Sequence, residues 1–199
     1  MRKLGGIFLV LAFLLPLWAR ADENMNMQQP SMCMVTSEMK MCTGTWQGKG
    51  TMKDMKTGNN VTYSERLTIR PTLNDKYMML NTVSDPDSMG NVFQGKGFST
   101  YIPSKNEYQL FWFDSTGFGG KFEGTKQGNT ITYVHEAPMG EEMILKMVMD
   151  SDTTHHMIMQ MQKPGEVPVT IMNITYTKTS DTPMELNSER PVQKVQNSY

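Results

Sequence analysis

The stretch YQLFWFDSTGFGG, residues 108–120, indicates the fold more directly than any other part of the sequence. Four large aromatic side chains lie in its first half, and glycines punctuate its second half. Aromatic side chains lose rotamer freedom in a helix, so this segment favours an extended strand. Alternation in a strand gives one face Tyr108, Leu110, Trp112 and Asp114, and the other face Gln109, Phe111 and Phe113. Because both faces carry apolar groups, we predict a central strand that is covered on both sides.

Further predicted strands flank this segment on both sides. Residues 61–70 alternate between apolar and polar side chains, as in an antiparallel strand with one buried face, and Glu65 lies on the apolar side. Turn residues separate the other predicted strands, which are residues 44–50, 77–83, 92–102, 119–126, 130–136, 143–149, 155–162 and 167–178. No βαβ spacing occurs. We predict an all-β antiparallel barrel or sandwich, and closure into an up-and-down β-barrel of about eight to ten strands would remove the exposed edges.

One short helix is expected before the first strand. Ser31 is a suitable N-cap residue, and apolar side chains follow at helical spacing up to about Met41. A helix that contained both Cys33 and Cys42 would separate them by about 13 Å along its axis. Disulfide-bonded Cα atoms lie within about 7 Å of each other, so a disulfide requires a shorter helix. The sequence leaves open whether the two cysteines are bonded.

The N-terminal segment has the features of a cleavable signal peptide. A basic start, an apolar run from Leu4 to Trp18 and an A-x-A site before Asp22 are typical of one, and an uncleaved membrane anchor is the alternative. The predicted organisation is a signal peptide at residues 1–21, a flexible leader at 22–31, a β-barrel domain at 32–178 and a disordered tail at 179–199. We therefore expect a periplasmic or secreted protein with no membrane span after signal cleavage.

The composition excludes some partners. The chain has a formal net charge of −1 with dispersed lysines, which does not favour nucleic-acid binding. Methionine is abundant, with 21 residues in the chain. The sequence does not indicate the oligomeric state.

Several motifs resemble one bacterial family in their order and spacing. They are Gly44-x-Trp46-x-Gly48-x-Gly50, Tyr63-x-Glu65, Gly95-x-Gly97-Phe98-x-x-Tyr101, Trp112-x-Asp114-Ser115 and Met172-x-Ile174-Thr175-Tyr176-Thr177-Lys178. The similarity to this family, domain of unknown function 1579, runs from about Val35 to Lys178. It implies a lipocalin- and nitrobindin-like barrel with a small central cavity and no particular activity. Nitrobindins bind haem through a histidine near the C-terminus, but residues 167–178 contain no histidine, so the resemblance concerns the fold and not a haem site.

The favoured function is binding of a small apolar or amphipathic ligand in the barrel, without catalysis. Six residues are expected to face the cavity, and these are Trp46, Tyr63, Glu65, Phe98, Trp112 and Tyr133. Glu65 would orient the ligand, and the alternative is a filled interior in which Glu65 pairs with an arginine or lysine. No nucleophile motif such as G-x-S-x-G and no H-E-x-x-H motif is present, and adjacent His155 and His156 would point to opposite faces of a strand.

The alternative function is binding of Cu(I) or scavenging of oxidants, because thioether and thiolate groups suit Cu(I) and methionine oxidises reversibly. One sulfur cluster consists of Met32, Cys33, Met34, Met39, Met41 and Cys42. A second would form in a hairpin from Met143, Met147, Met149, Met157, Met159 and Met161. Methionine is also an adaptable filler of protein cores, and this reading stays open for both clusters. No cofactor is required by either function apart from Cu(I) in the second.

Overall fold

The fold was analysed in a computed structural model, which describes residues 32–54 and 57–186 of the 199-residue chain. The predicted signal peptide, the leader and residues 187–199 of the predicted tail lie outside these ranges. No helix in the described part of the chain is both long and apolar enough to cross a membrane.

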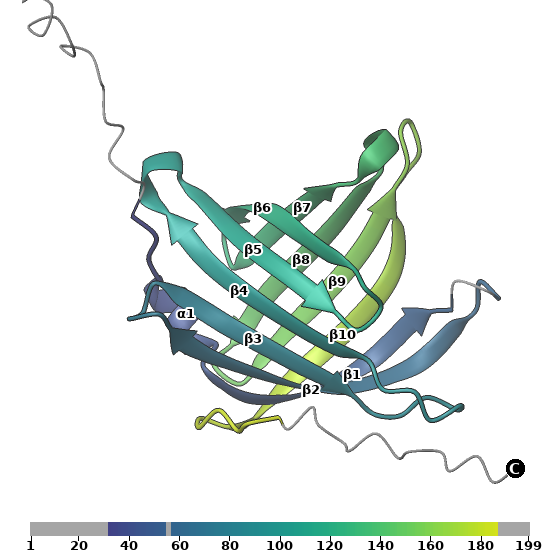
Figure 1. Cartoon of the computed structure of the whole chain (residues 1–199), viewed down its shortest axis with the longest axis horizontal. Coiled ribbons are helices and arrows are strands. Elements are labelled where there is room, and N and C mark those ends of the chain that lie inside the picture. The colour runs from purple at the N-terminus through teal and green to yellow at the C-terminus, as the bar shows by residue number, and fades with distance from the viewer. Residues whose placement is uncertain (1–31, 55–56, 187–199) are drawn as a thin grey trace, which may run out of the picture. The chain divides into compact units, whose positions relative to one another are not determined.

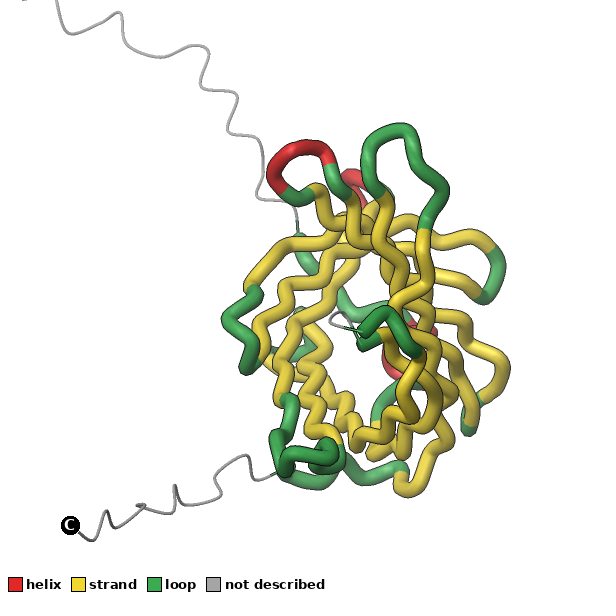
Figure 2. Tube along the Cα trace, turned by 90° about the vertical axis from the view of Figure 1, so that its right-hand side faces the viewer, coloured by secondary structure: helices red, strands yellow, loops and turns green. Residues whose placement is uncertain are grey.

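Ten antiparallel strands form a closed barrel in which each strand pairs with its neighbours in sequence and β1 pairs with β10 (Figure 1). The strands are β1 (Gly44–Lys53), β2 (Asn60–Thr72), β3 (Tyr77–Ser84), β4 (Gln94–Ile102), β5 (Glu107–Asp114), β6 (Gly119–Gln127), β7 (Thr130–Glu136), β8 (Glu142–Ser151), β9 (Thr154–Gln162) and β10 (Val169–Ser180). Figure 2 shows how they encircle the interior. The predicted all-β antiparallel barrel is confirmed.

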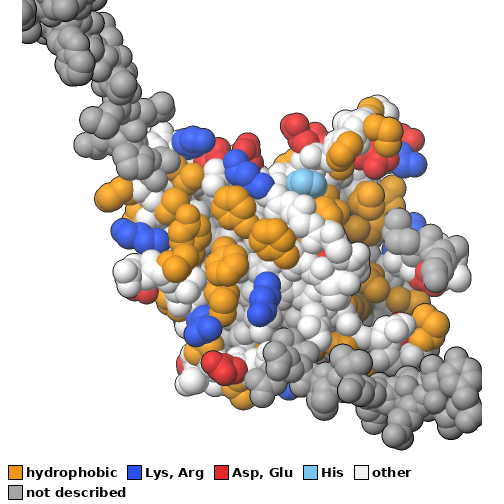
Figure 3. All heavy atoms as spheres, in the orientation of Figure 1, with side chains coloured by type: hydrophobic (Ala, Val, Ile, Leu, Met, Phe, Trp, Pro, Cys, Tyr) orange, Lys and Arg blue, Asp and Glu red, His pale blue; other side chains and the backbone are white. Residues whose placement is uncertain are grey.

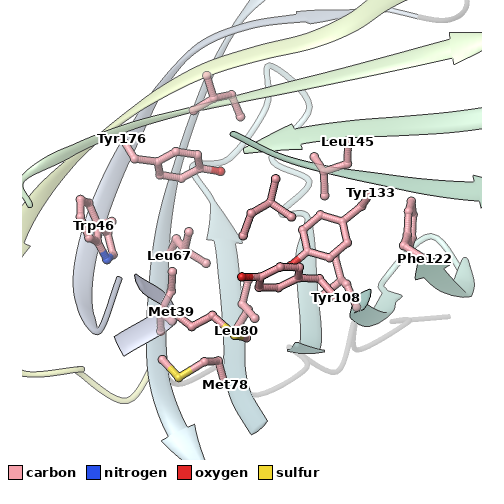
Figure 4. Packing of buried hydrophobic residues seen from close by; sticks show 14 of the residues in the cluster. Met39, Trp46, Leu67, Met78, Leu80, Tyr108, Phe122, Tyr133, Leu145 and Tyr176 are labelled. Atoms are coloured by element: carbon pink, nitrogen blue, oxygen red, sulfur yellow. The ribbon is translucent and has the colours of Figure 1, made fainter. Parts of the chain in front are cut away.

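Alternation along each strand separates the interior from the outer surface. In β3 every second residue from Met78 to Ser84 is buried, and the residues between them are half-buried. The same pattern in the other strands brings leucine, isoleucine, methionine and aromatic side chains together inside the barrel (Figure 4). Burial of these apolar groups inside the barrel is the main stabilising contribution that the sequence pattern encodes.

Glycines beside large aromatic residues shape this interior. An added Cβ at Gly95 would lie 2.2 Å from the Trp112 ring, and one at Gly97 would lie 2.8 Å from it. Trp112 of β5 can therefore lie across β4, because β4 presents only glycine at these two inward positions. Gly48 of β1 plays the same role for Tyr176 of β10, whose ring would be 2.7 Å from a Cβ there. The glycine motifs thus let aromatic rings cross a neighbouring strand.

The helix α1 (Ser37–Met41) covers one end of the barrel and is shorter than expected. Its N-cap is Thr36, whose hydroxyl accepts a hydrogen bond from the Met39 amide at 3.3 Å. The helix does not start near Ser31, because Met34 is held in an extended bridge by two backbone hydrogen bonds with Tyr101. Both cysteines are free: Cys33 Sγ lies 3.4 Å from the Tyr77 hydroxyl, and Cys42 packs inside the barrel.

The expectation that β5 is covered on both sides holds only in part. Its inner face is buried or half-buried. On the outer face Gln109 is buried and Phe111 is half-buried, but Phe113 is 55% exposed. Figure 3 shows hydrophobic side chains on this side of the barrel, with lysine and arginine side chains among them.

The chain remains in contact with the barrel beyond the predicted end of the domain. β10 continues to Ser180, and the Thr45 hydroxyl then donates to the Thr182 carbonyl and accepts from the Met184 amide, each at 3.0 Å. The first residues of the predicted disordered tail therefore pack on β1.

Candidate functional site

The barrel contains a cavity of about 380 Å³ that is lined mainly by apolar side chains. This volume falls within the range of about 300–1,000 Å³ that is typical of small-molecule sites. Six thioethers contribute to its wall, namely Met52, Met143, Met147, Met157, Met159 and Met172. Aromatic rings contribute as well, namely Phe93, Trp112, Phe118, Phe122 and Tyr176. The cavity reaches Lys53 and Thr116, which lie at the end of the barrel opposite α1.

Glu65 is the carboxylate deepest in this cavity, with 3% of the residue exposed. Its Oε2 accepts hydrogen bonds from the Tyr63 hydroxyl at 2.9 Å and from the Thr82 hydroxyl at 2.6 Å. Its Oε1 accepts a hydrogen bond from the Tyr176 hydroxyl. None of the ion pairs found among the described residues includes Glu65. Three hydroxyl groups, rather than an arginine or a lysine, therefore stabilise this buried acid.

The tyrosines at this carboxylate are held as hydrogen-bond donors. Burial, and then the neighbouring Glu65, raises the pKa of Tyr63 and of Tyr176 above the ordinary value. Both phenols therefore keep their protons over the physiological pH range, and both can donate to Glu65 throughout it.

His155 lies beside this carboxylate cluster and lines the same cavity. Its ring stacks on Tyr176 at a centroid distance of 4.6 Å and meets the Trp46 ring edge-on at 4.4 Å. The residue is 2% exposed, and within the described chain neither ring nitrogen has a hydrogen-bond partner. Burial lowers the pKa of His155 to about 4, so the imidazole is neutral near pH 7 and offers one donor and one acceptor.

Strand register explains why these groups meet. Across β2, β1, β10 and β9, the cross-strand partners Glu65, Gly48, Tyr176 and His155 form one row on the inner face. Gly48 has no side chain, so the Tyr176 ring passes over β1 and its hydroxyl reaches the carboxylate. We call the group Glu65, Tyr63, Thr82, Tyr176 and His155 the polar floor of the cavity.

The structure places the six predicted ligand-binding residues differently from one another. Glu65 and Trp112 line the cavity, and Tyr63 supports Glu65. Trp46 is buried outside the cavity lining, where its Nε1 donates to the Cys42 carbonyl at 2.9 Å. Tyr133 lines a separate hollow of about 40 Å³.

The expected inward orientation of Phe98 is wrong. Its neighbours Gly97 and Ser99 are the buried residues on this part of β4, and Phe98 is half-buried on the outer face. The inward positions of β4 are taken by small residues, because the Trp112 ring covers Gly95 and Gly97. Phe98 lines none of the hollows described above.

The six N-terminal sulfur residues do not gather at one place. Met32 is 74% exposed, Met34 and Met41 are also exposed, and Met39 is buried in the core. Cys33 contacts Tyr77 at the surface, whereas Cys42 Sγ lies 3.7 Å from Met149 Sδ inside the barrel. Within residues 32–54 and 57–186, no three histidine, cysteine or acidic residues are grouped closely enough to hold a metal ion.

The methionines of the β8–β9 hairpin face each other inside the barrel. Met143 pairs with Met161, Met147 with Met157, and Met149 with His155. Met143, Met147, Met157 and Met159 line the cavity. Four of the six predicted methionines therefore form part of the cavity wall, and Met149 lines the smaller hollow beside Tyr133.

Sequence reasoning did not select three residues of the polar floor, namely Thr82, His155 and Tyr176. For His155 a signal existed, because it shares the inward alternation of Met157 and Met159 in β9. Tyr176 belongs to the last of the family-like motifs, Met172 to Lys178, but the sequence alone indicated no role for it. Thr82 carried no signal, because its role depends on the pairing of β3 with β2.

Comparisons with known proteins agree with this architecture. A family model described as "Protein of unknown function (DUF1579)" matches residues 36–178. The structure is similar to the crystal structure of Rv2717c from M. tuberculosis, with a TM-score of 0.55, 13% sequence identity, and coverage of 72% of this chain and 98% of that chain. At this identity the likeness concerns the fold alone. Among proteins with curated descriptions, none matches this chain in sequence.

Proposed function

The chain belongs to the family described as "Protein of unknown function (DUF1579)", and from this starting point we propose that its barrel is a non-enzymatic binding protein for a small apolar or amphipathic molecule. The observation that carries the proposal is the cavity of about 380 Å³, whose wall is apolar and whose floor is polar. Such a combination is typical of small-molecule sites, where apolar walls supply affinity and a few polar groups fix the orientation.

The polar floor favours an amphipathic ligand over a purely apolar one. A buried donor or acceptor without a partner costs about 1–3 kcal/mol, and both ring nitrogens of His155 are in this situation. A ligand with a hydrogen-bonding head would satisfy them, while its apolar part would contact Trp112 and the methionines of the wall.

Binding of N-phenylnaphthylamine, a neutral dye that fluoresces in apolar surroundings, tests this function. The variant Trp112→Ala removes an aromatic side of the cavity, and Phe113→Ala is its matched control, because Phe113 is the next residue on the same strand but faces outward. We expect saturable binding to the wild-type protein, weakened at least fivefold in Trp112→Ala and unchanged in Phe113→Ala. An absence of saturable binding, or an equal effect of the two substitutions, would contradict the proposal.

We also propose that the protein is exported and works in the periplasm or outside the cell. The basic start, the apolar run and the A-x-A site before Asp22 support this proposal. Intact-mass measurement of the protein from the periplasmic fraction should give a chain that begins at Asp22. Recovery of an uncleaved chain in the membrane fraction would contradict export as a free protein.

A second candidate function is Cu(I) binding, and one contact favours it. Cys42 Sγ and Met149 Sδ lie 3.7 Å apart, and His155 is the cross-strand partner of Met149. Thiolate, thioether and imidazole groups all suit Cu(I). Retention of Cu(I) against a competing chelator, and its loss in Cys42→Ser but not in Cys33→Ser, would support this candidate. Equal retention by both variants would exclude this pair as the site.

A further inference from the structure

The chemistry of the polar floor indicates which head group the cavity takes, and this inference rests on the function proposed above. We propose that the cavity selects amphiphiles with a protonated amine over those with a carboxylate, and that the ammonium group binds at the polar floor beside Glu65. The hydrocarbon tail then lies along the apolar wall towards the open end of the barrel.

The first step concerns charge. Of the residues that line the cavity, Glu65 and Asp114 carry carboxylates and Lys53 carries the one ammonium group. Lys53 and Asp114 end their strands at the end of the barrel opposite α1, so the carboxylate at the floor is that of Glu65, whose two oxygens accept three hydroxyl hydrogen bonds. Charges interact more strongly inside a protein than in water, because the effective dielectric constant is lower. An anionic head brought to this floor is repelled, and a cationic head is attracted.

The second step concerns hydrogen bonds. A carboxylate has about four lone-pair sites, and the three hydroxyl donors at Glu65 use two on Oε2 and one on Oε1. One acceptor site remains on Oε1. Neutral His155 supplies a second acceptor nitrogen, and Tyr176 links it to Glu65 by stacking on the imidazole and donating to the carboxylate. The floor therefore offers two free acceptors and one free donor, the N–H of His155. An ammonium group has three donors and can use either acceptor, whereas a carboxylate head can bond only to the single N–H.

The third step concerns the wall. The groups that would surround the head and tail are polarizable thioethers and aromatic rings, among them Met157, Trp112 and Phe122. Aromatic faces attract cations, and thioethers pack well against flexible hydrocarbon chains. No arginine lines the cavity, so the wall contains no guanidinium group to receive a fatty-acid carboxylate.

Competition with bound N-phenylnaphthylamine tests the selectivity. Decylamine, decanol and decanoate share one chain length and differ in charge. Near pH 7 decylamine is a cation, because a comparable alkylammonium group has a pKa of about 10.4, and decanoate is an anion, because a comparable carboxylic acid has a pKa of about 4.3. Decanol is neutral. On the purified full chain, we expect decylamine to bind at least tenfold more tightly than decanoate, a difference of about 1.4 kcal/mol, with decanol between them. Glu65→Gln should remove most of the preference for the amine, and Glu136→Gln, which changes an exposed residue of β7, should leave it unchanged.

The outcomes separate the two proposals. If all three probes displace the dye equally, or decanoate binds most tightly, the amine selectivity is refuted and the ligand-binding function stands. If neither the dye nor any probe binds, the function itself is refuted, and the selectivity with it. The ranking on the wild-type protein decides the matter even if Glu65→Gln does not fold. An equal loss of amine preference in Glu136→Gln would show that the amine binds at the acidic surface, and this would refute the assignment to the floor.

Discussion

Gly48→Ala should destabilise the barrel, although it adds only one methyl group. The new Cβ would lie 2.7 Å from Tyr176 Cε1, 3.0 Å from Tyr176 Cδ1 and 3.0 Å from Ile174 Cγ2. Tyr176 and Ile174 are both fully buried, and the Tyr176 ring is stacked on His155 while its hydroxyl bonds to Glu65, so a shift of the ring disrupts these contacts. The Tyr176 ring must shift away from β1, and its hydroxyl then leaves Glu65.

The expected magnitude follows from two losses and one gain. Overpacking of a well-packed core costs about 1–3 kcal/mol. Loss of a hydrogen bond to a charged group costs about 1.5–3 kcal/mol. Replacement of glycine by alanine restricts the unfolded chain and returns about 0.4–1 kcal/mol. The free energy of unfolding should therefore fall by about 2–5 kcal/mol, if these contributions add.

Equilibrium unfolding in urea measures this change, and a double-mutant cycle with Tyr176→Phe identifies its cause. If Gly48→Ala acts by displacing the Tyr176 hydroxyl, both single variants lose the same hydrogen bond. The double variant should then lose less stability than the two single variants added together, by about 1 kcal/mol or more. Lys49→Ala is the matched control on the exposed face of β1 and should change stability by no more than about 0.5 kcal/mol. A loss below about 0.5 kcal/mol for Gly48→Ala, or strict additivity with Tyr176→Phe, would refute this account of the row.

Two further predictions concern α1 and the buried histidine. Thr36→Ala removes the N-cap hydroxyl of α1 and should lower the free energy of unfolding by about 1 kcal/mol. Thr36→Ser keeps a hydroxyl and should remain close to the wild-type stability. Equal losses in the two variants would argue against capping. Burial lowers the pKa of His155 from 6.5 to about 4, so the unfolded chain binds the proton more readily than the folded chain between these values. Stability should therefore fall as the pH falls from about 6.5 to 4, by about 3 kcal/mol at 1.36 kcal/mol per pKa unit. His155→Phe should lack this part of the pH dependence, and an unchanged profile in that variant would contradict the assignment.

The barrel was predictable from the sequence because its strands alternate clearly and turn residues separate them. The predicted strand at 130–136 coincides with β7, and the one at 155–162 begins one residue after β9 does. Alternation does not show which face of a strand points into the barrel when both faces carry apolar side chains. On β4, Phe98 is predicted to face inward, but the inward positions are those of Gly95 and Gly97, over which the Trp112 ring lies.

The site was predictable only in part, because its chemistry depends on pairing between strands that are distant in sequence. Glu65 was identifiable within one strand, as an acid on an apolar face. Its donor Tyr176 lies 111 residues further along the chain and reaches it only after β10 closes the barrel against β1. His155 comes next to this pair because β9 pairs with β10. The helix start was missed for a similar reason, since the bridge between Met34 and Tyr101 is a tertiary contact.

Methionine labelling provides the most direct test of the central claim that the cavity holds a ligand. In protein labelled with carbon-13 at the methionine methyl groups, Met52, Met143, Met147, Met157, Met159 and Met172 report on the cavity. The exposed residues Met32, Met89 and Met139 report on the surface. Titration with decylamine should shift the cavity resonances and leave the surface resonances in place. Shifts confined to the surface methionines, or no shifts at ligand concentrations that saturate dye displacement, would contradict the account.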